Sequence, residues 1–326
     1  VVWLYMLTTF VAAALSVVTS MLFPQTLLLA EAAEAEVIPQ GLGEVMHTLL
    51  SNIVSNPISA IMNGNYIGIL MWGCLFGVAM KKLGADSTKV FLSNTADAVS
   101  TIVRWIINLA PFGIMGLVFT NVVSNGLAIF TQYGKLLLLL VGTMLFMALV
   151  INPIIIFIYL RCNPYPLVFR CLRESGLTAF FTRSSAANIP VNMAMCEKLG
   201  MDKDFYSVSI PLGATINMDG TAIYQCVATI FLATCCGMTL TLGQMVTIVV
   251  TATLASIGTA GTPGAGMIML AMVLEAMNIP VDMIMIIYGI DRLFDMGRTC
   301  LNVTGDIACS LCVTKWESKK AAQTAK

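Results

Sequence analysis

Long apolar runs dominate this sequence and set the first limit on its fold. Four of them occupy residues 1–23, 65–80, 98–123 and 135–160. They approach or exceed the roughly 20 residues that a membrane-spanning helix needs. A bilayer admits only helices or closed β-barrels, and continuous apolar runs lack the alternation of barrel strands. Only 10% of the residues are charged, too few to cover the surface of a soluble domain. We therefore predict an all-α polytopic membrane protein.

Loop charges predict how these spans are oriented. Residues 24–64 carry four Glu and no Lys or Arg, whereas 81–97 carry three Lys and 161–173 carry three Arg. The C-terminal tail is also rich in Lys. By the positive-inside rule, 24–64 lies outside and the other three segments lie in the cytoplasm. We expect an integral, multi-pass protein of the plasma (inner) membrane with a cytoplasmic C-terminus.

The first apolar run differs from a signal peptide, because it has neither an initiating Met nor a basic flank. We interpret it as a spanning helix of a chain that is N-terminally truncated. The formal net charge is zero and no basic stripe is present. Nucleic acid is therefore excluded as a partner, and a lipid bilayer is expected.

The second half of the sequence is interrupted by polar and Gly/Pro-rich clusters, at 182–185, 217–221 and 256–266. Non-helical backbone at membrane depth is tolerated where it lines an enclosed cavity. Interrupted helices in corresponding positions point to the binding site of a transporter. We therefore predict two re-entrant hairpins, at about 174–200 and 243–278, that form an inverted repeat.

The last apolar helix carries a polar stripe. Its members share one helical face, because they are spaced by four, three, four and four residues: Asp291, Asp295, Arg298, Asn302 and Asp306. One interpretation is that they form ion pairs between helices. The three carboxylates outnumber the single guanidinium, however, and excess carboxylate with amide and backbone oxygens suits a hard cation. We predict a cation site.

Two further polar positions have a structural and a functional interpretation. Asp219 and Gly220 are predicted to lie in an unwound stretch between two apolar halves, where Asp219 either caps a helix or binds a cation. Ser184 and Ser185 either cap the returning arm of their hairpin or, with the N–H groups there, bind a carboxylate. Both roles of the serines are compatible.

Four motifs carry a specific family resemblance, namely TRSSAANIPV (182–191), PLGATINMDGTAIYQ (211–225), ASIGTAGTPGAG (255–266) and DMGRTCLNVTGD (295–306). The sequence resembles the dicarboxylate/amino acid:cation symporter family, which includes sodium-coupled glutamate/aspartate and serine/threonine transporters. The resemblance implies a glutamate-transporter-like fold that forms a homotrimer. It also implies a transport-domain helix at 1–23, scaffold and trimerisation helices at 24–134, and a transport domain at 135–326 with its last helix at about 281–315.

The resemblance implies a substrate site and three sodium sites. Asp295 would bind the amino group of the substrate, Arg298 would bind a side-chain carboxylate, and the full substrate set would be Ser185, Thr221, Thr262, Gly266, Asp295, Arg298, Thr299 and Asn302. The first sodium site would comprise Gly213, Asn217, Asn302 and Asp306. The second would comprise the carbonyls of Thr215, Ser256, Ile257 and Thr259. The third would comprise Tyr5, Thr8, Thr9, Asn217 and Asp219. Apart from these coupling ions, we expect no cofactor.

The substrate itself is open between two classes. An Arg in an apolar cavity favours a carboxylate, so we expect an acidic amino acid, aspartate or glutamate. The alternative is that Asp291 or Asp295 neutralises Arg298 and leaves a neutral pocket for serine or threonine. The segment 55–70 is similar to the serine/threonine branch, whereas the chain from Asp219 onward is similar to the acidic branch. A dicarboxylate is less favoured, because Asp295 would then face no ammonium group.

Other classes of function fit the sequence less well. A channel needs rings of repeated pore-lining groups, whereas the broken helices here are asymmetric. An enzyme needs a nucleophile with a base, and neither HExxH nor GxSxG occurs in the sequence. We therefore expect a secondary symporter with alternating access and no enzymatic activity, and the family resemblance implies that its transport domain moves as an elevator.

Overall fold

The computed structural model describes residues 1–25, 47, 50–51, 54–63, 66–125, 128–257 and 259–324. Every regular element in these ranges is a helix, as the sequence predicts. Most of the predicted external segment 24–64, with its four Glu, lies outside the described residues. The chain divides into two compact units, one formed by Val1–Leu42 and Phe130–Lys326 and the other by Gly43–Ile129.

The longer helical segments described in the smaller unit are α3 (Pro57–Asn63), α4 (Tyr66–Leu83) and α5 (Asp86–Asn125). The Nε1 atom of Trp72 in α4 donates a hydrogen bond to the carbonyl of Ser55, 2.8 Å away, next to α3. The predicted spans 65–80 and 98–123 fall within α4 and α5. The predicted charged loop between them is mostly helical, because α5 already begins at Asp86.

The larger unit begins with α1 (Val2–Leu22), which packs against α12 (Asp219–Cys235) and α13 (Leu242–Ile257). A second long segment combines α6 (Ala128–Phe146), a π-helical turn (Met147–Ile151) and α7 (Asn152–Leu160). By length and composition, Val2–Leu22 and Tyr133–Leu160 are able to cross a membrane. They coincide with the predicted spans 1–23 and 135–160.

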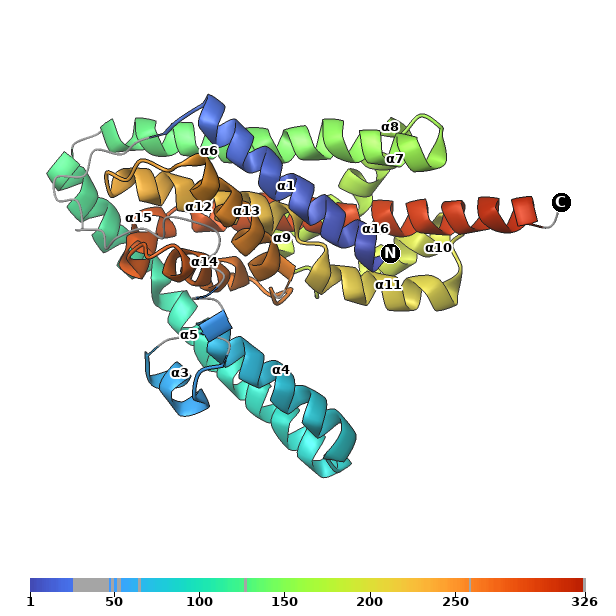
Figure 1. Cartoon of the computed structure of the whole chain (residues 1–326), viewed down its shortest axis with the longest axis horizontal. Helices are drawn as coiled ribbons and strands as arrows, with labels where there is room; N and C mark the ends of the chain where they lie inside the picture. Colours follow the sequence, from blue (N-terminus) through green and yellow to red (C-terminus); the bar gives the residue numbers. More distant parts are fainter. Residues whose placement is uncertain are drawn as a thin grey trace. The chain divides into compact units, whose positions relative to one another are not determined.

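Two helical hairpins flank a broken helix in this unit (Figure 1). The first hairpin contains α8 (Tyr165–Cys171), a π-helical turn (Leu172–Gly176), α9 (Leu177–Thr182) and α10 (Ile189–Lys198). The broken helix consists of α11 (Lys203–Ile216) and α12, and Asp202 caps its start by accepting bonds from the N–H groups of Asp204 and Phe205. The second hairpin consists of α13 and α14 (Ala265–Ala276). The cluster positions 182–185, 217–218 and 259–264 thus mark helix ends.

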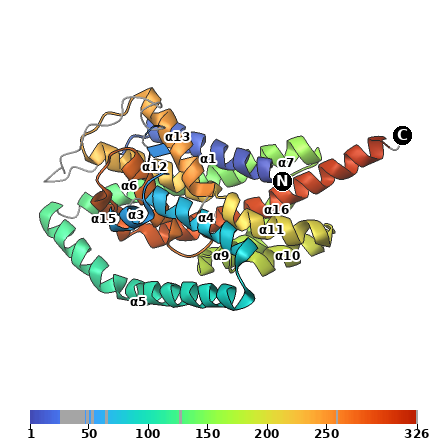
Figure 2. The same cartoon turned by 60° about the horizontal axis from the view of Figure 1, so that its bottom comes forward.

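The chain ends with a 3₁₀ turn (Val281–Met283), α15 (Ile284–Tyr288) and α16 (Asp291–Thr324). The C-terminal end of α16 extends past its neighbours in this unit (Figures 1 and 2). The prediction of one helix over 281–315 is wrong at both ends. The N–H of Ile290 bonds the carbonyl of Ile287 in a tight turn, so α16 begins only after this turn, at Asp291. At its other end, α16 continues to Thr324.

The break between α11 and α12 is shorter than predicted. Asn217 and Met218 are the unwound residues, whereas Asp219 and Gly220 already belong to the first turn of α12. The reason is that the N–H of Ala222 bonds the carbonyl of Met218 at 2.9 Å, which starts the helical ladder there.

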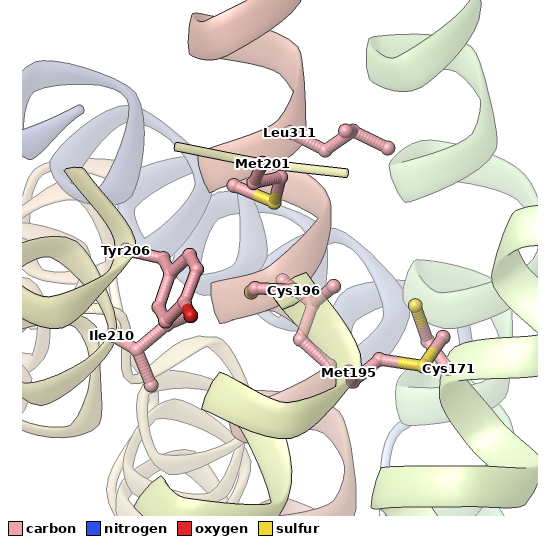
Figure 3. Close-up of a cluster of buried hydrophobic side chains, with 8 residues drawn as sticks. Cys171, Met195, Cys196, Met201, Tyr206, Ile210 and Leu311 are labelled. Atoms are coloured by element: carbon pink, nitrogen blue, oxygen red, sulfur yellow. The ribbon is translucent and has the colours of Figure 1, made fainter. Parts of the chain in front are cut away.

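A buried apolar cluster fixes the first hairpin and α11 against α16 (Figure 3). Its members come from all three parts of the unit: Cys171, Met195, Cys196, Met201, Tyr206, Ile210, Ile307 and Leu311. Burial of such side chains stabilises a soluble protein by about 1.5–3 kcal/mol each, but in a bilayer the gain comes from close packing. The cluster therefore sets the position of α16, which carries the polar stripe, relative to the first hairpin and α11.

Candidate functional site

The polar stripe of α16 is buried as a whole, and the prediction that its members share one protected face is confirmed. Asp291, Asp295, Arg298, Asn302 and Asp306 are each at most 3% exposed. The stripe lies close to α12 because Gly220 has no side chain. A Cβ atom at that position would lie 2.5 Å from both the Cα and the carbonyl oxygen of Arg298. The crossing of α12 and α16 therefore depends on this glycine.

The N-terminal half of the stripe is a compensated ion cluster. Asp295 Oδ1 lies 2.9 Å from Arg298 Nε and 2.8 Å from Nη2, and Asp291 Oδ1 lies 3.4 Å from Nη1. The guanidinium also lies over the ring of Tyr224, 4.6 Å from its centroid, at cation–π distance. This is the pairing of the alternative interpretation, in which Asp291 or Asp295 is the counter-charge of Arg298.

The C-terminal half of the stripe is uncompensated. Asp306 Oδ1 accepts a bond from Asn217 Nδ2 at 3.1 Å, and Asp219 Oδ1 accepts one from Thr9 Oγ1 at 3.2 Å. The second oxygen of each carboxylate, Oδ2, is buried and has no hydrogen-bond partner within the described part of the chain. Nor does any Lys or Arg in the described ranges form an ion pair with either carboxylate.

Such a pair of carboxylates fits a sodium ion. Burying an anion without a counter-charge is costly, and hard cations bind carboxylate, amide and carbonyl oxygens. The neighbouring groups are oxygens of this kind: the Oδ1 atom of Asn217 accepts from Thr8 Oγ1 at 2.9 Å, and the carbonyl of Asn302 accepts from Asn217 Nδ2 at 3.3 Å. A Cβ at Gly213 would lie 2.6 Å from Asp306 Oδ1, so this glycine lets α11 approach the site.

Tyr5 joins this region through its hydroxyl, which donates to the backbone carbonyl of Asp306 at 3.4 Å. Its hydroxyl lies 2.8 Å from Ser310 Oγ and donates to the carbonyl of Ser209 at 3.1 Å. Its own carbonyl accepts a bond from Thr8 Oγ1 at 3.0 Å. The residues of the first and third predicted sodium sites therefore lie in one continuous polar region.

The second predicted sodium site is less completely assembled. Thr259 donates its N–H to the carbonyl of Ser256 at 3.0 Å, and these residues with Ile257 lie at the tip of the second hairpin. Gly258 lies outside the described residues. Thr215 is exposed, and its hydroxyl bonds the carbonyl of Leu212 within α11. The end of α11 approaches the hairpin at the preceding residue, Ala214.

The tips of the two hairpins meet at the carbonyl of Gly261. This oxygen accepts bonds from Ser184 Oγ at 2.8 Å and from the N–H of Ala186 at 2.9 Å. A Cβ at Gly261 would lie 2.9 Å from that nitrogen and 3.0 Å from the carbonyl oxygen of Ala214. Close contact between the tips therefore requires glycine at this position.

A small cavity lies beneath the tips, with a volume of about 10 Å³, close to the space needed for one water molecule. All eight residues of the predicted substrate set line it. Asp295 Oδ2 accepts the N–H of Gly264 at 3.2 Å, Asn302 Oδ1 accepts the N–H of Gly220 at 2.7 Å, and Thr299 Oγ1 donates to the carbonyl of Asp295 at 2.8 Å. A Cβ at Gly266 would collide with the guanidinium of Arg298. Hydrogen-bond donors and acceptors that suit the ammonium and carboxylate groups of an amino acid thus line this cavity.

Three contributors to this site lie outside the substrate and sodium sets implied by the family resemblance. Asp291 was recognised as part of the stripe and, in the alternative interpretation, as a counter-charge of Arg298. Ser184 was considered, with Ser185, as a helix cap or as part of a carboxylate-binding tip, but its bond to the carbonyl of Gly261 was not predicted. Tyr224 gave no signal in a single sequence, because an aromatic residue on an apolar helix is ordinary.

Broken helices, buried carboxylates without a counter-charge, and two hairpin tips that meet over a small polar cavity are together typical of a secondary transporter of the membrane. A sequence model of the sodium:dicarboxylate symporter family matches residues 1–316. The chain belongs to this family and is therefore a polytopic, sodium-coupled symporter and not an enzyme.

Two relatives are similar over most of the chain. The serine/threonine transporter SstT of Bifidobacterium adolescentis is 57% identical over 311 residues, which cover 94% of this chain and 72% of the relative. The serine/threonine transporter SstT of Streptococcus agalactiae is 47% identical over 312 residues, which cover 94% of this chain and 77% of the relative.

Proposed function

We propose that this symporter carries a small neutral amino acid, serine or threonine, together with sodium. The observation that supports this proposal is the pairing of Arg298 with Asp291 and Asp295. The cluster carries one net negative charge, which an ammonium group neutralises. An acidic substrate would bring an additional carboxylate to a cluster in which two carboxylates already share one guanidinium. The proposal thus replaces the acidic substrate expected from the sequence, and the names of the two relatives agree with it.

Each end of the substrate has partners in the proposed site. The Oδ2 atom of Asp295 receives the ammonium group in place of the N–H of Gly264, which it accepts in this structure. The α-carboxylate lies between Asn302 and the N–H groups at the tip of the first hairpin near Ser185. The substrate hydroxyl lies toward Thr221 and Thr262. Sodium is held by Asp219, Asp306 and Asn217, and at a second position by the carbonyls around Ser256.

The second hairpin acts as the gate in this proposal. The cavity is too small for an amino acid, so a segment that covers it has to move before substrate enters. The second hairpin covers it with glycine-rich backbone over 261–266, and its tip is held by the single carbonyl of Gly261 and by the bond from Gly264 to Asp295. Glycine adopts backbone angles that other residues avoid, and Gly264 has a φ of 80°.

The remaining parts of the proposal concern the whole transporter. The hairpins at 174–200 and 243–278 are re-entrant, and residues 1–23 and 135–326 form a transport domain that moves as an elevator. Residues 24–134 form the scaffold of a homotrimer, and the C-terminus is cytoplasmic. Support comes from the broken helices, the loop charges and the family to which the chain belongs.

Competition in proteoliposomes tests the substrate class. Uptake of labelled serine under an inward sodium gradient is measured with unlabelled serine, threonine, aspartate or succinate added. We expect serine and threonine to compete at similar concentrations and aspartate to need at least about tenfold more, because an unpaired buried carboxylate costs 1.4 kcal/mol or more. If aspartate competes as well as serine, the neutral assignment fails while sodium symport stands. Uptake that persists when potassium replaces sodium would instead refute the coupling.

A further inference from the structure

A buried polar network joins the two arms of the first hairpin. Ser175 lies in the first arm, and Asn188 and Asn192 lie at the start of the second, and all three are at most 1% exposed. Asn188 Nδ2 donates to Ser175 Oγ at 2.8 Å and to Asn192 Oδ1 at 2.9 Å. Ser175 Oγ also donates to Asn192 Oδ1. Buried amides are costly unless they are bonded, so this network fixes the two arms relative to each other.

The network continues into both parts of the candidate site. At the hairpin tip, the N–H of Asn188 bonds the carbonyls of Ser184 and Ser185 at 3.2 and 3.1 Å. On the opposite side, Asn192 Nδ2 donates to the carbonyl of Val303 in α16 at 3.0 Å. Asn192 is therefore the only member of the three whose side chain bonds α16 among the described contacts.

The bonded carbonyl lies directly beside the sodium region. The carbonyl before it, that of Asn302, accepts Asn217 Nδ2 at 3.3 Å, and Asp306 follows on the same face of α16. Asparagine side chains from two different elements thus hold consecutive carbonyls of α16. Gly176 allows the first arm to lie this close, since a Cβ there would lie 2.9 Å from Cys300 Sγ and 3.1 Å from Thr304 Cγ2.

We propose that Asn192 is a positioning residue for sodium binding, which links the tip of the first hairpin at Ser185 to the segment Asn302–Asp306. The proposal rests on the proposed function, because it assigns sodium to that segment. The hydrogen bond from Asn192 to Val303 fixes the carbonyl of Asn302 and the carboxylate of Asp306 relative to the tip of the first hairpin. Ligand spacing that is fixed before binding lowers the free energy spent on ordering the site.

Ser175 supplies a matched control in the same network. Ser175→Ala removes one hydroxyl but leaves the bonds from Asn188 to Asn192 and from Asn192 to Val303. Asn192→Leu keeps a similar volume and removes the bond to α16. Both changes perturb the buried hairpin, but only the second one disconnects it from the sodium region.

The experiment measures the sodium dependence of two quantities. The first is the sodium concentration that half-activates serine uptake, and the second is the sodium concentration at which half of the maximal rise in melting temperature is reached without substrate. We expect Asn192→Leu to raise both roughly five- to tenfold, which corresponds to the loss of one buried hydrogen bond, and Ser175→Ala to raise them less than about twofold. Asn192→Ser, which is too short to reach Val303, provides the same test if the leucine variant does not fold.

Equal sodium midpoints in the wild type and Asn192→Leu, with only the melting temperature lowered, would overturn the positioning role and leave Asn192 as a packing residue. If serine is not transported but the leucine variant still shifts the sodium-dependent melting curve, the substrate assignment fails and the positioning role is supported. A wild-type protein that sodium does not stabilise would overturn both.

Discussion

The two halves of the polar stripe on α16 solve the problem of buried charge in opposite ways. In the first half, the carboxylates of Asp291 and Asp295 share the guanidinium of Arg298. In the second half, Asp306 of α16 and Asp219 of the neighbouring α12 each have an oxygen without a partner in the described chain. Both sets of carboxylates are buried, and Asp291, Asp295 and Asp306 lie on the same face of α16.

This difference separates two carboxylates to which the fold supplies a counter-charge from two that it leaves for a ligand. A buried carboxylate that is paired with a cation of the protein is stable in the empty protein, and its remaining oxygen can bind a further donor, such as an ammonium group. Two carboxylates without a cation make the empty protein less stable and the cation-bound protein more stable. In the proposed function, coupling to sodium follows from the second arrangement and selectivity for the substrate from the first.

The largest expected effect comes from removing the built-in cation. Arg298→Met replaces the guanidinium with a shorter, unbranched and uncharged side chain and leaves two carboxylates buried without a counter-charge, a change that typically costs about 3–5 kcal/mol. We expect the melting temperature to fall by several degrees and serine uptake to fall roughly a hundredfold or more. The measurements are thermal unfolding in detergent and initial rates in proteoliposomes.

A second substitution restores the charge balance of that half. In Arg298→Met with Asp291→Asn, one net negative charge remains, as in the wild type, and we expect most of the lost stability to return. If Arg298→Met alone is as stable as the wild type, Arg298 is not the counter-charge of the cluster, and the comparison between the two halves collapses.

Removing a charge from the uncompensated half should have the opposite effect on the stability of the sodium-free protein. Asp306→Asn removes a charge that has no partner, so without sodium we expect the melting temperature to stay the same or rise. Sodium should no longer raise it, because the ion stabilises in proportion to its binding, and transport should fall about tenfold or more. Thermal unfolding in sodium and in potassium buffers measures both. Unchanged stabilisation by sodium would remove Asp306 from the site.

Much of the arrangement was predictable because it depends on spacing along the chain. The interrupted helices followed from polar and Gly/Pro-rich clusters within apolar runs, and the shared face of Asp291 to Asp306 followed from helical periodicity. The position of the break at Asn217–Met218 was less predictable, since it depends on which carbonyl first accepts a helical bond. The early start of α5 at Asp86 was missed because its first turns are too polar to resemble a membrane span.

The direction of the Arg298 side chain was the feature that the sequence left open. Offsets of three and seven residues allow Arg298 to reach Asp295 and Asp291, and the same offsets allow its free edge to face a substrate. Tertiary packing decides between them: Tyr224 lies under the guanidinium, and Gly266 allows hairpin backbone to lie against it. Both residues come from elements that are distant from Arg298 in sequence, so no local sequence pattern predicts the direction of its side chain.

The smallest expected effect is a change in selectivity, and it isolates the contact between Asp291 and Arg298. Asp291→Asn removes one charge from the compensated half, so Asp295 and Arg298 balance each other and Nη1 loses its carboxylate partner. A substrate carboxylate then has a cation to pair with, and a charge-assisted bond contributes about 1.5–3 kcal/mol. We therefore expect aspartate to compete with labelled serine about tenfold better than in the wild type, with serine uptake retained. Asp282→Asn, an exposed carboxylate in the turn before α15, is the control and should leave the ratio unchanged. An unchanged ratio in Asp291→Asn, together with normal serine uptake, would show that Asp295 alone holds Arg298 away from the substrate. A gain for aspartate would instead show that the charge balance at one end of a single helix sets the class of substrate.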